Sequence, residues 1–246
     1  MDGVRVIRSE LLDAAGIIVS GVSTRLGGVS PPPLGMNLSY AVDDTEENVT
    51  ANRKIFLGEL GIRTEPLAFP GQVHSATVCI AAVPGRYPGC DALVTRVRGV
   101  YCGVSVADCA PLLLLDTRSP AVAAVHAGWR GTADGIAAKT VDVLGREFGT
   151  KPADLVVFLG PSAGSCCYNV GEEVAGRFHP NCVDRSAGLV RLDLKKANVR
   201  QLVKAGIPLD HIEVSELCTI CRPDLFHSFR RDRLRSGRMM AVIGLP

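Results

Sequence analysis

The sequence predicts an α+β fold in which residues 1–246 form a single domain. Apolar runs of strand length recur along the whole chain, and several are rich in Val and bounded by Gly, Pro or Asp. Between residues 76 and 126 these runs follow one another without a helix between each pair, which argues against a doubly wound parallel sheet. No stretch rich in Pro, Gly or Ser is long enough to link two domains, and we interpret residues 30–35 as a rigid loop.

Seven strands are expected from these runs: Gly16–Val22, Ala76–Ala82, Val100–Val106, Pro111–Asp116, Ala121–His126, Leu155–Leu159 and Met239–Leu245. Helical spacing of apolar residues predicts three helices and a short fourth one: Thr45–Leu60, Gly131–Phe148, Asp193–Ala205 and a turn near Gly171. Thr45 and Asp193 are suitable N-cap residues, because their side-chain oxygens can accept a hydrogen bond from the first helical turn.

Composition excludes several classes of protein. A hydrophobic content of 47% with 21% charged residues is typical of a soluble globular chain. A net charge of +2 and 5% aromatic residues give no reason to expect nucleic acid as a partner. We interpret the basic residues near the C-terminus as a solvated face: Arg230, Arg231, Arg233, Arg235 and Arg238.

Location and assembly follow from what the sequence lacks. No apolar run reaches the roughly 18 residues that a membrane span needs, so no membrane is expected. The first residues lack the apolar core of a secretory peptide, and nine cysteines is an odd number without a regular spacing. A cytoplasmic protein with reduced thiols is therefore expected, as a monomer or a small homo-oligomer.

Three residues have the side chains of a metal site. Cys109 and His126 lie at the ends of apolar runs in the segment from Val106 to Gly135, and His74 lies at the edge of another. Two imidazoles and a thiolate are the donor set of a catalytic zinc, which keeps its fourth position open. The same donors also suit copper, which outcompetes zinc at many nitrogen and sulfur sites. Taken alone, each of these residues could equally have a structural role, and only their combination predicts a metal site.

The other cysteines give a weaker signal. Cys218 and Cys221 have the C-x-x-C spacing of redox and zinc sites, and Cys166 is adjacent to Cys167. No second C-x-x-C pair completes a cage of four cysteines, so we interpret Cys218 and Cys221 as structural or an incidental thiol site, with Cys218 bordering the pocket. Cys166 and Cys167 could indicate redox chemistry or a second metal, but we favour a structural loop.

Long motifs in the chain resemble the YfiH-like laccase-domain family, whose members are named multicopper polyphenol oxidoreductases. They include GVSTRLGGVS from Gly21, GQVH ending at His74, CDALVT from Cys90, GVSVADCAPLLLLD from Gly103 and AVAAVHAGWRGTADGI from Ala121. The resemblance continues through MNLSYAVDD, LGPSAGSCCYNVGEEV, LDLKKANVRQL and FHSFRRDRLRSGRMMAVIGL and covers nearly the whole chain. It implies a layered α/β/β/α domain with mixed sheets, a fold shared with cytotoxic necrotizing factor.

The resemblance also implies an activity. In the family, the residues matching His74, Cys109 and His126 bind one zinc. The implied reactions are phosphorolysis of adenosine, inosine, guanosine and methylthioadenosine to free purine and the ribose 1-phosphate, and deamination of adenosine. A three-ligand zinc supplies the activated water that deamination needs. The expected partners are therefore purine nucleosides and phosphate.

Substrate contacts are expected from residues near these motifs. Arg25, flanked by Gly27 and Gly28, is the expected phosphate ligand and is grouped with the three metal ligands as a catalytic residue. Arg130 is a second candidate for the phosphate. Ser23 and Asn37 could bind the ribose or base, and Tyr168 could stack on the purine.

Other functions stay open from the sequence alone. Cys109 could instead be the nucleophile of a cysteine hydrolase, with His126 or His74 as base, and an amidase that edits muropeptide precursors belongs to the same alternatives. A copper-dependent polyphenol oxidoreductase, as the family name implies, would need more histidine ligands than five histidines provide. A regulatory protein with a residual metal site is disfavoured, because a scaffold needs no such donors.

Overall fold

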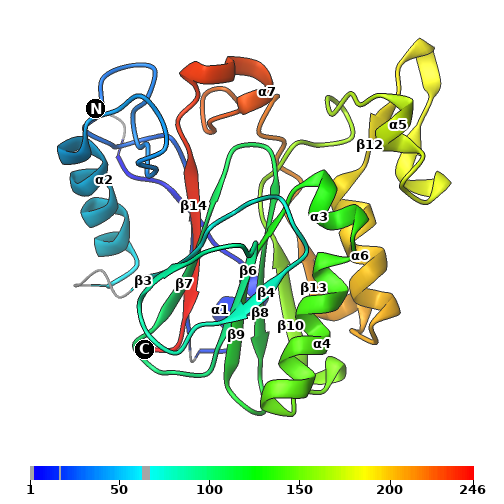
Figure 1. The fold of residues 1–246 in the computed structure, drawn as a ribbon. Coiled ribbons are helices and arrows are strands. Elements are labelled where there is room, and N and C mark those ends of the chain that lie inside the picture. The colour runs from blue at the N-terminus through cyan, green and yellow to red at the C-terminus, as the bar shows by residue number, and fades with distance from the viewer. Residues whose placement is uncertain (1–2, 17, 63–66) are drawn as a thin grey trace.

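Two mixed sheets pack face to face in the computed structural model, which describes residues 3–16, 18–62 and 67–246 (Figure 1). Over this part of the chain the first sheet has six strands, in the order β1 (Val6–Ile7), β2 (Val19–Ser23), β14 (Met239–Gly244), β7 (Tyr101–Val106), β3 (Leu67–Pro70) and β5 (Gly85–Tyr87). The second also has six, in the order β13 (Ile212–Val214), β10 (Leu155–Leu159), β8 (Ala110–Asp116), β9 (Ala121–Ala127), β6 (Ala92–Thr95) and β4 (Val78–Ile80).

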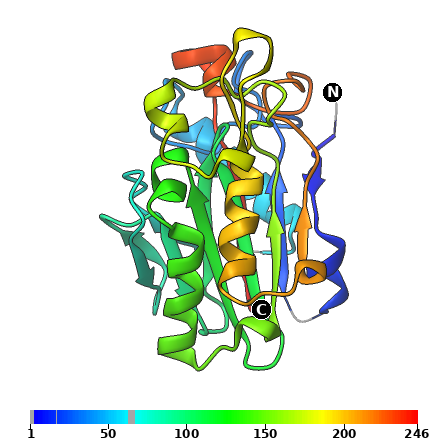
Figure 2. The ribbon, with the colours of Figure 1, turned by 90° about the vertical axis from the view of Figure 1, so that its right-hand side faces the viewer.

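Helices cover the outer face of each sheet. Helix α2 (Glu46–Glu59) packs Phe56 and Leu57 against Met240 and Val242 of the first sheet. Helices α4 (Ile136–Phe148) and α6 (Leu194–Lys204) cover the second sheet and lie side by side in Figure 2. The layers are therefore helix, sheet, sheet and helix, and the predicted α+β fold with mixed sheets is confirmed.

Smaller elements lie at the periphery of these layers. They are α1 (Glu10–Ala14), α3 (Trp129–Ala133), α5 (Glu172–Ala175), α7 (Phe229–Asp232) and the paired strands β11 (Val183–Asp184) and β12 (Arg191–Leu192). Figure 1 shows α7 and α5 at the same end of the molecule. None of the helices that the structure describes has the length and apolar character of a membrane span.

Side-chain alternation explains why the central strands are apolar throughout. In β8, Leu113 and Leu115 enter the core between the sheets, whereas Leu112 and Leu114 enter the core beneath α4 and α6. Because successive residues of a strand point to opposite faces, a strand that is buried on both faces must be apolar at every position. The uninterrupted apolar run of β8 is the sequence signature of this double burial.

Most predicted elements are confirmed, with shifts at their ends. Strand β2 begins later than the predicted range Gly16–Val22, of which Ile17 lies outside the described residues. Thr45 and Asp193 cap their helices by accepting hydrogen bonds from Asn48 and Lys196. Within α6, however, Val203 is exposed, although the helical spacing of the apolar residues predicts it on the buried face of the helix.

The prediction of one helix over Gly131–Phe148 was wrong. The chain forms α3 and α4 instead, separated by Asp134 and Gly135, and Gly135 has a φ of +83°. This left-handed conformation, which glycine adopts at little cost, breaks the helix. The first of the two helices, α3, follows β9 closely and begins at Trp129, near the residues of the candidate site.

Candidate active site

The three predicted metal ligands come together at one end of the second sheet. The ligand atoms of His74, Cys109 and His126 all lie within 4.8 Å of one another. Cys109 immediately precedes β8, and His126 lies near the end of β9, the antiparallel neighbour of β8. Because Ala110 pairs with Ala127, the strand register itself brings Cys109 beside the end of β9. The sequence prediction that these three residues share a site agrees with the geometry.

His74 reaches the site from the loop between β3 and β4. Its φ is +60°, and Gln72, two residues earlier, has a φ of +53°. Left-handed backbone in residues other than glycine is uncommon and marks a loop that the surrounding structure holds in place. The rings of His74 and His126 meet edge to face, with centroids 4.9 Å apart.

Asp91 holds this arrangement together and was not singled out from the sequence. It is fully buried just before β6, and its carboxylate accepts hydrogen bonds from the backbone N–H groups of His74 and Ser75 at 2.9 and 2.7 Å. The same carboxylate lies 2.8 Å from Nδ1 of His126. Burial opposes ionisation of Asp91, but the hydrogen bonds from His126 and Ser75 outweigh it and lower its pKa to about 2.

This contact orients His126 for metal binding. An ionised carboxylate can only accept, so Nδ1 of His126 carries a proton, and in the neutral ring Nε2 keeps its lone pair. A histidine that donates one ring N–H to a carboxylate and offers the other nitrogen is the usual arrangement in metal sites. The feature of the sequence that could have indicated Asp91 is the CDALVT motif, in which it is the polar residue before an apolar strand.

Cys109 lies in a polar environment that favours its thiolate. Burial raises the pKa of the thiol, but the adjacent His126 and His74 outweigh burial and lower it to about 6. Gly128 leaves room beside it, because a Cβ there would lie 3.1 Å from Sγ of Cys109 and 3.1 Å from Cδ2 of His74. Two imidazoles and a thiolate that converge in this way fit a divalent ion of the zinc type.

Asp108 ties the Cys109 turn to the C-terminal segment. Its φ is +90°, and its carboxylate accepts hydrogen bonds from Thr219 Oγ1 at 2.6 Å, Ser228 Oγ at 3.0 Å and the backbone N–H of Arg230 at 2.6 Å. Segments far apart in the chain therefore meet directly beside the metal-type residues. Asp108 lies directly before Cys109 in the sequence, which gives no sign of these partners.

Tyr168 and Arg230 form one wall near Cys109. The Arg230 guanidinium lies 4.8 Å from the centroid of the Tyr168 ring, and Arg230 Nη1 donates to the Asn169 carbonyl at 2.9 Å. Burial, followed by the charge of Cys109, raises the pKa of Tyr168 to about 12. The charge of Arg238 interacts with both Asp108 and Cys109. Two arginines interpreted as part of a solvated face thus contribute positive charge near the site.

The other predicted substrate contacts have structural partners. Arg25 donates to the backbone carbonyls of Pro33 and Pro223, and Ser23 Oγ accepts from the Met240 N–H at 3.0 Å. Asn37 is fully buried and bonded to Asp44, Ser39 and Arg238. The exposed Arg130 stacks on Trp129 at 4.6 Å. Substrate binding by these four residues stays a prediction.

The structure brings four of the remaining cysteines together. No second C-x-x-C pair exists, but the adjacent pair Cys166 and Cys167 lies against Cys218 and Cys221, with all four sulfurs within 4.8 Å of one another. The sequence did not join the two pairs, because adjacent cysteines do not have the spacing of a zinc knuckle. Among the residues that the structure describes, these four cysteines and the His74–Cys109–His126 group are the clusters that could hold a metal.

Comparisons with known proteins show the family of this chain. The family model described as multi-copper polyphenol oxidoreductase laccase matches residues 19–246. The chain is 37% identical to purine nucleoside phosphorylase YlmD of Geobacillus stearothermophilus over 92% of this chain and 89% of that protein. It is 35% identical to adenosine deaminase RL5 of an unknown prokaryotic organism over 97% of this chain and 99% of that one.

A solved structure gives the same result for the fold. The crystal structure of YlmD from Geobacillus stearothermophilus superimposes with a TM-score of 0.91 at 34% identity, covering 100% of this chain and 99% of that one. The sequence motifs, the layered fold and the similarity to the relatives all extend over nearly the full length of the chain. The chain belongs to the multi-copper polyphenol oxidoreductase laccase family, in its YlmD- and YfiH-like branch.

Proposed function

We propose that this chain is a zinc-dependent enzyme of purine nucleosides, which cleaves them with phosphate and also deaminates adenosine. The observation that carries the proposal is the convergence of His74, Cys109 and His126, with Asp91 orienting His126. Relatives named purine nucleoside phosphorylase and adenosine deaminase support the substrate class. The substrates are adenosine, inosine, guanosine and methylthioadenosine, and the phosphorolysis products are the free purine and the ribose 1-phosphate.

The described residues have distinct tasks in this proposal. When bound by His74, Cys109 and His126, a zinc ion acts as a Lewis acid toward a water or a substrate oxygen. Asp91 holds His126 in one tautomer, and the stacking of the purine is assigned to Tyr168, as the sequence predicts. Arg238 and Arg230 supply positive charge for phosphate near Cys109, together with the predicted contribution of Arg25.

The experiment combines metal content with turnover on the same purified samples. Wild type, Cys109→Ala and the control Cys182→Ala are incubated with each nucleoside, with and without phosphate, and the purines are separated by chromatography. We expect phosphate-dependent release of free purine and conversion of adenosine to inosine, both lost in Cys109→Ala and kept in Cys182→Ala. Metal-bound wild type without turnover of any nucleoside would contradict the proposal.

A cysteine hydrolase remains a second candidate because one observation favours it. Cys109, His126 and Asp91 also have the order of a nucleophile, a base and a carboxylate that orients the base. One thiolate does not serve as zinc ligand and free nucleophile at once. Rapid alkylation of Cys109 in metal-free wild type, with hydrolysis of amide substrates such as muropeptide precursors, would favour this candidate.

The copper-dependent oxidation of polyphenols, which the family description names, has less support. Among the residues that the structure describes, only His74 and His126 of the five histidines belong to a metal-type cluster. His211 lies 3.1 Å from the Leu155 carbonyl through Nδ1, and His179 accepts from the Asn181 N–H. A centre for several copper ions needs more imidazoles than this site brings together.

A further inference from the structure

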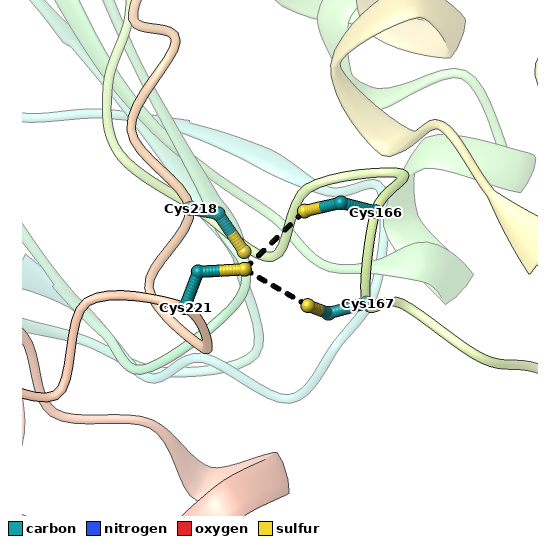
Figure 3. A group of neighbouring side chains, drawn as sticks. All are labelled: Cys166, Cys167, Cys218 and Cys221. Atoms are coloured by element: carbon teal, nitrogen blue, oxygen red, sulfur yellow. Dashed lines mark hydrogen bonds between the residues drawn. The ribbon is translucent and has the colours of Figure 1, made fainter.

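Four cysteines from two separate loops converge outside the candidate active site. Figure 3 shows Cys166 and Cys167 on one loop and Cys218 and Cys221 on another, with their sulfurs directed toward one another. Sγ of Cys221 lies 3.5 Å from Sγ of Cys166 and 2.9 Å from Sγ of Cys167. The loops are more than fifty residues apart in the sequence, so this convergence is a product of the fold.

The backbone joins the two loops independently of the sulfurs. Ser162 and Cys218 form an isolated parallel bridge, and the Thr219 N–H donates to the Ser162 carbonyl at 3.0 Å. On one side Cys167 and Tyr168 turn back to donate to the Gly164 carbonyl, and on the other Arg222 donates to the Cys218 carbonyl. Each cysteine pair therefore sits on a turn that has backbone hydrogen bonds of its own.

We propose that Cys166, Cys167, Cys218 and Cys221 bind a second zinc ion as a closed structural site of four thiolates. The sulfurs of a tetrahedral zinc lie about 3.8 Å apart, given bonds of about 2.3 Å, and the 3.5 Å contact is close to this value. Cys167 and Cys221 have to separate by about 1 Å to accept the ion. A disulfide would require the same two sulfurs to approach to about 2 Å.

The surroundings favour a thiolate at Cys218. The Gly164 N–H donates to Sγ of Cys218 at 3.2 Å, which stabilises a thiolate. Lys195 is buried, its Nζ donates to the carbonyls of Ser215 and Leu217, and its charge interacts with Cys218 and Cys166. A buried ammonium offsets part of the negative charge that a zinc ion with four thiolates retains.

One ion fits this group better than an iron–sulfur cluster. All four sulfurs lie within 4.8 Å of one another, which suits a single central ion. A cluster of several irons and sulfides has to hold its thiolates farther apart, around a larger body. Tetrahedral sites of four sulfurs select zinc among the divalent ions available to a protein.

This second site would brace the candidate active site. Tyr168 follows Cys167 directly, and Thr219 follows Cys218 and donates to the Asp108 carboxylate beside Cys109. An ion that clamps the two loops therefore fixes two residues that line or support the other centre. The effect is exerted through the backbone, since none of the four cysteines belongs to the His74–Cys109–His126 group.

The decisive experiment removes the first site and examines the second. Full-length Cys109→Ala is purified with a reductant and reconstituted with zinc or with cobalt(II). We expect about one zinc per chain with a sulfur-only shell at about 2.3 Å in X-ray absorption. Cobalt(II) should give strong thiolate charge-transfer bands. Wild type should carry about two zinc ions, one in each site.

Matched variants complete the test. Cys221→Ser should lose about one zinc relative to wild type, whereas the control Cys182→Ala should lose none. The proposal is overturned if reduced, reconstituted Cys109→Ala binds no metal, if its zinc has a nitrogen-containing shell, or if wild type purified with reductant contains a Cys167–Cys221 disulfide. The proposal does not rest on the activity of the first site, so nucleoside turnover does not decide it.

Discussion

The two groups of metal-type side chains in this molecule are built in opposite ways. His74, Cys109 and His126 project from the ends of strands and a strained loop, and the buried carboxylate of Asp91 orients His126. The four cysteines project from two turns, where Cys166 and Cys221 are exposed. Three ligands on a rigid frame leave a coordination position for substrate, whereas four ligands on loops close the shell.

This contrast supports the proposed catalytic role of the first group and the proposed structural role of the second. Catalytic constellations depend on rigid support, because small displacements of the reacting groups are costly. A structural ion instead supplies rigidity where the backbone has little, as in turns without regular secondary structure.

Replacing Cys109 with Ala should have the largest effect. The substitution removes the only sulfur ligand of the first group, so turnover of nucleosides should fall to the detection limit while the four-cysteine group keeps its metal. Turnover and metal content are measured on one sample, with Cys182→Ala as the control. Normal activity of Cys109→Ala would show that the first group is not the active site.

Replacing Asp91 with Asn should weaken metal binding by about 10- to 100-fold, the usual effect of removing the partner of a ligating histidine. The amide cannot accept every hydrogen bond that the carboxylate accepts from His126, His74 and Ser75. Affinity is measured by competition with a chelator. Asp116→Asn is the matched control, since Asp116 is a buried aspartate that accepts backbone N–H bonds at the far end of β8.

Replacing Gly128 with Ala tests how tightly the first group is packed. The new methyl group would lie 3.1 Å from both Cys109 Sγ and His74 Cδ2, so the ligands must shift, at an expected cost of about 1–3 kcal/mol in stability. Chemical denaturation and turnover measure the two consequences. Gly145→Ala, in the middle of α4 with a nearest contact of 3.4 Å, should instead be neutral or stabilising.

Replacing Thr219 with Val tests the connection between the two groups and should have the smallest effect. The valine keeps the shape but leaves Oδ1 of Asp108 without its 2.6 Å donor, at an expected cost of about 1–3 kcal/mol. Thermal unfolding measures this cost, and turnover should fall several-fold while both metals remain. Thr140→Val is the control, because Thr140 is a buried threonine that donates only within α4.

Seven of the strands that the structure describes, the long helices and the candidate ligands of the first group follow from the sequence alone. Their signals are local: the doubly buried residues 110–115 of β8 are apolar at each position, and a helix such as Ile136–Phe148 shows its buried face at helical spacing. Likewise, His126 and Cys109 each lie at the end of an apolar run, and their combination with His74 indicates a metal site.

The contacts between these residues depend on the tertiary structure. Asp91 is an unremarkable acidic residue in the sequence, and its role appears when β6 is placed beside β9 and its carboxylate reaches His126. The four cysteines form a group only because two loops are joined through Ser162 and Cys218. Contacts between distant segments depend on how the sheets and loops pack. A local stretch of sequence does not indicate which distant segment it will contact.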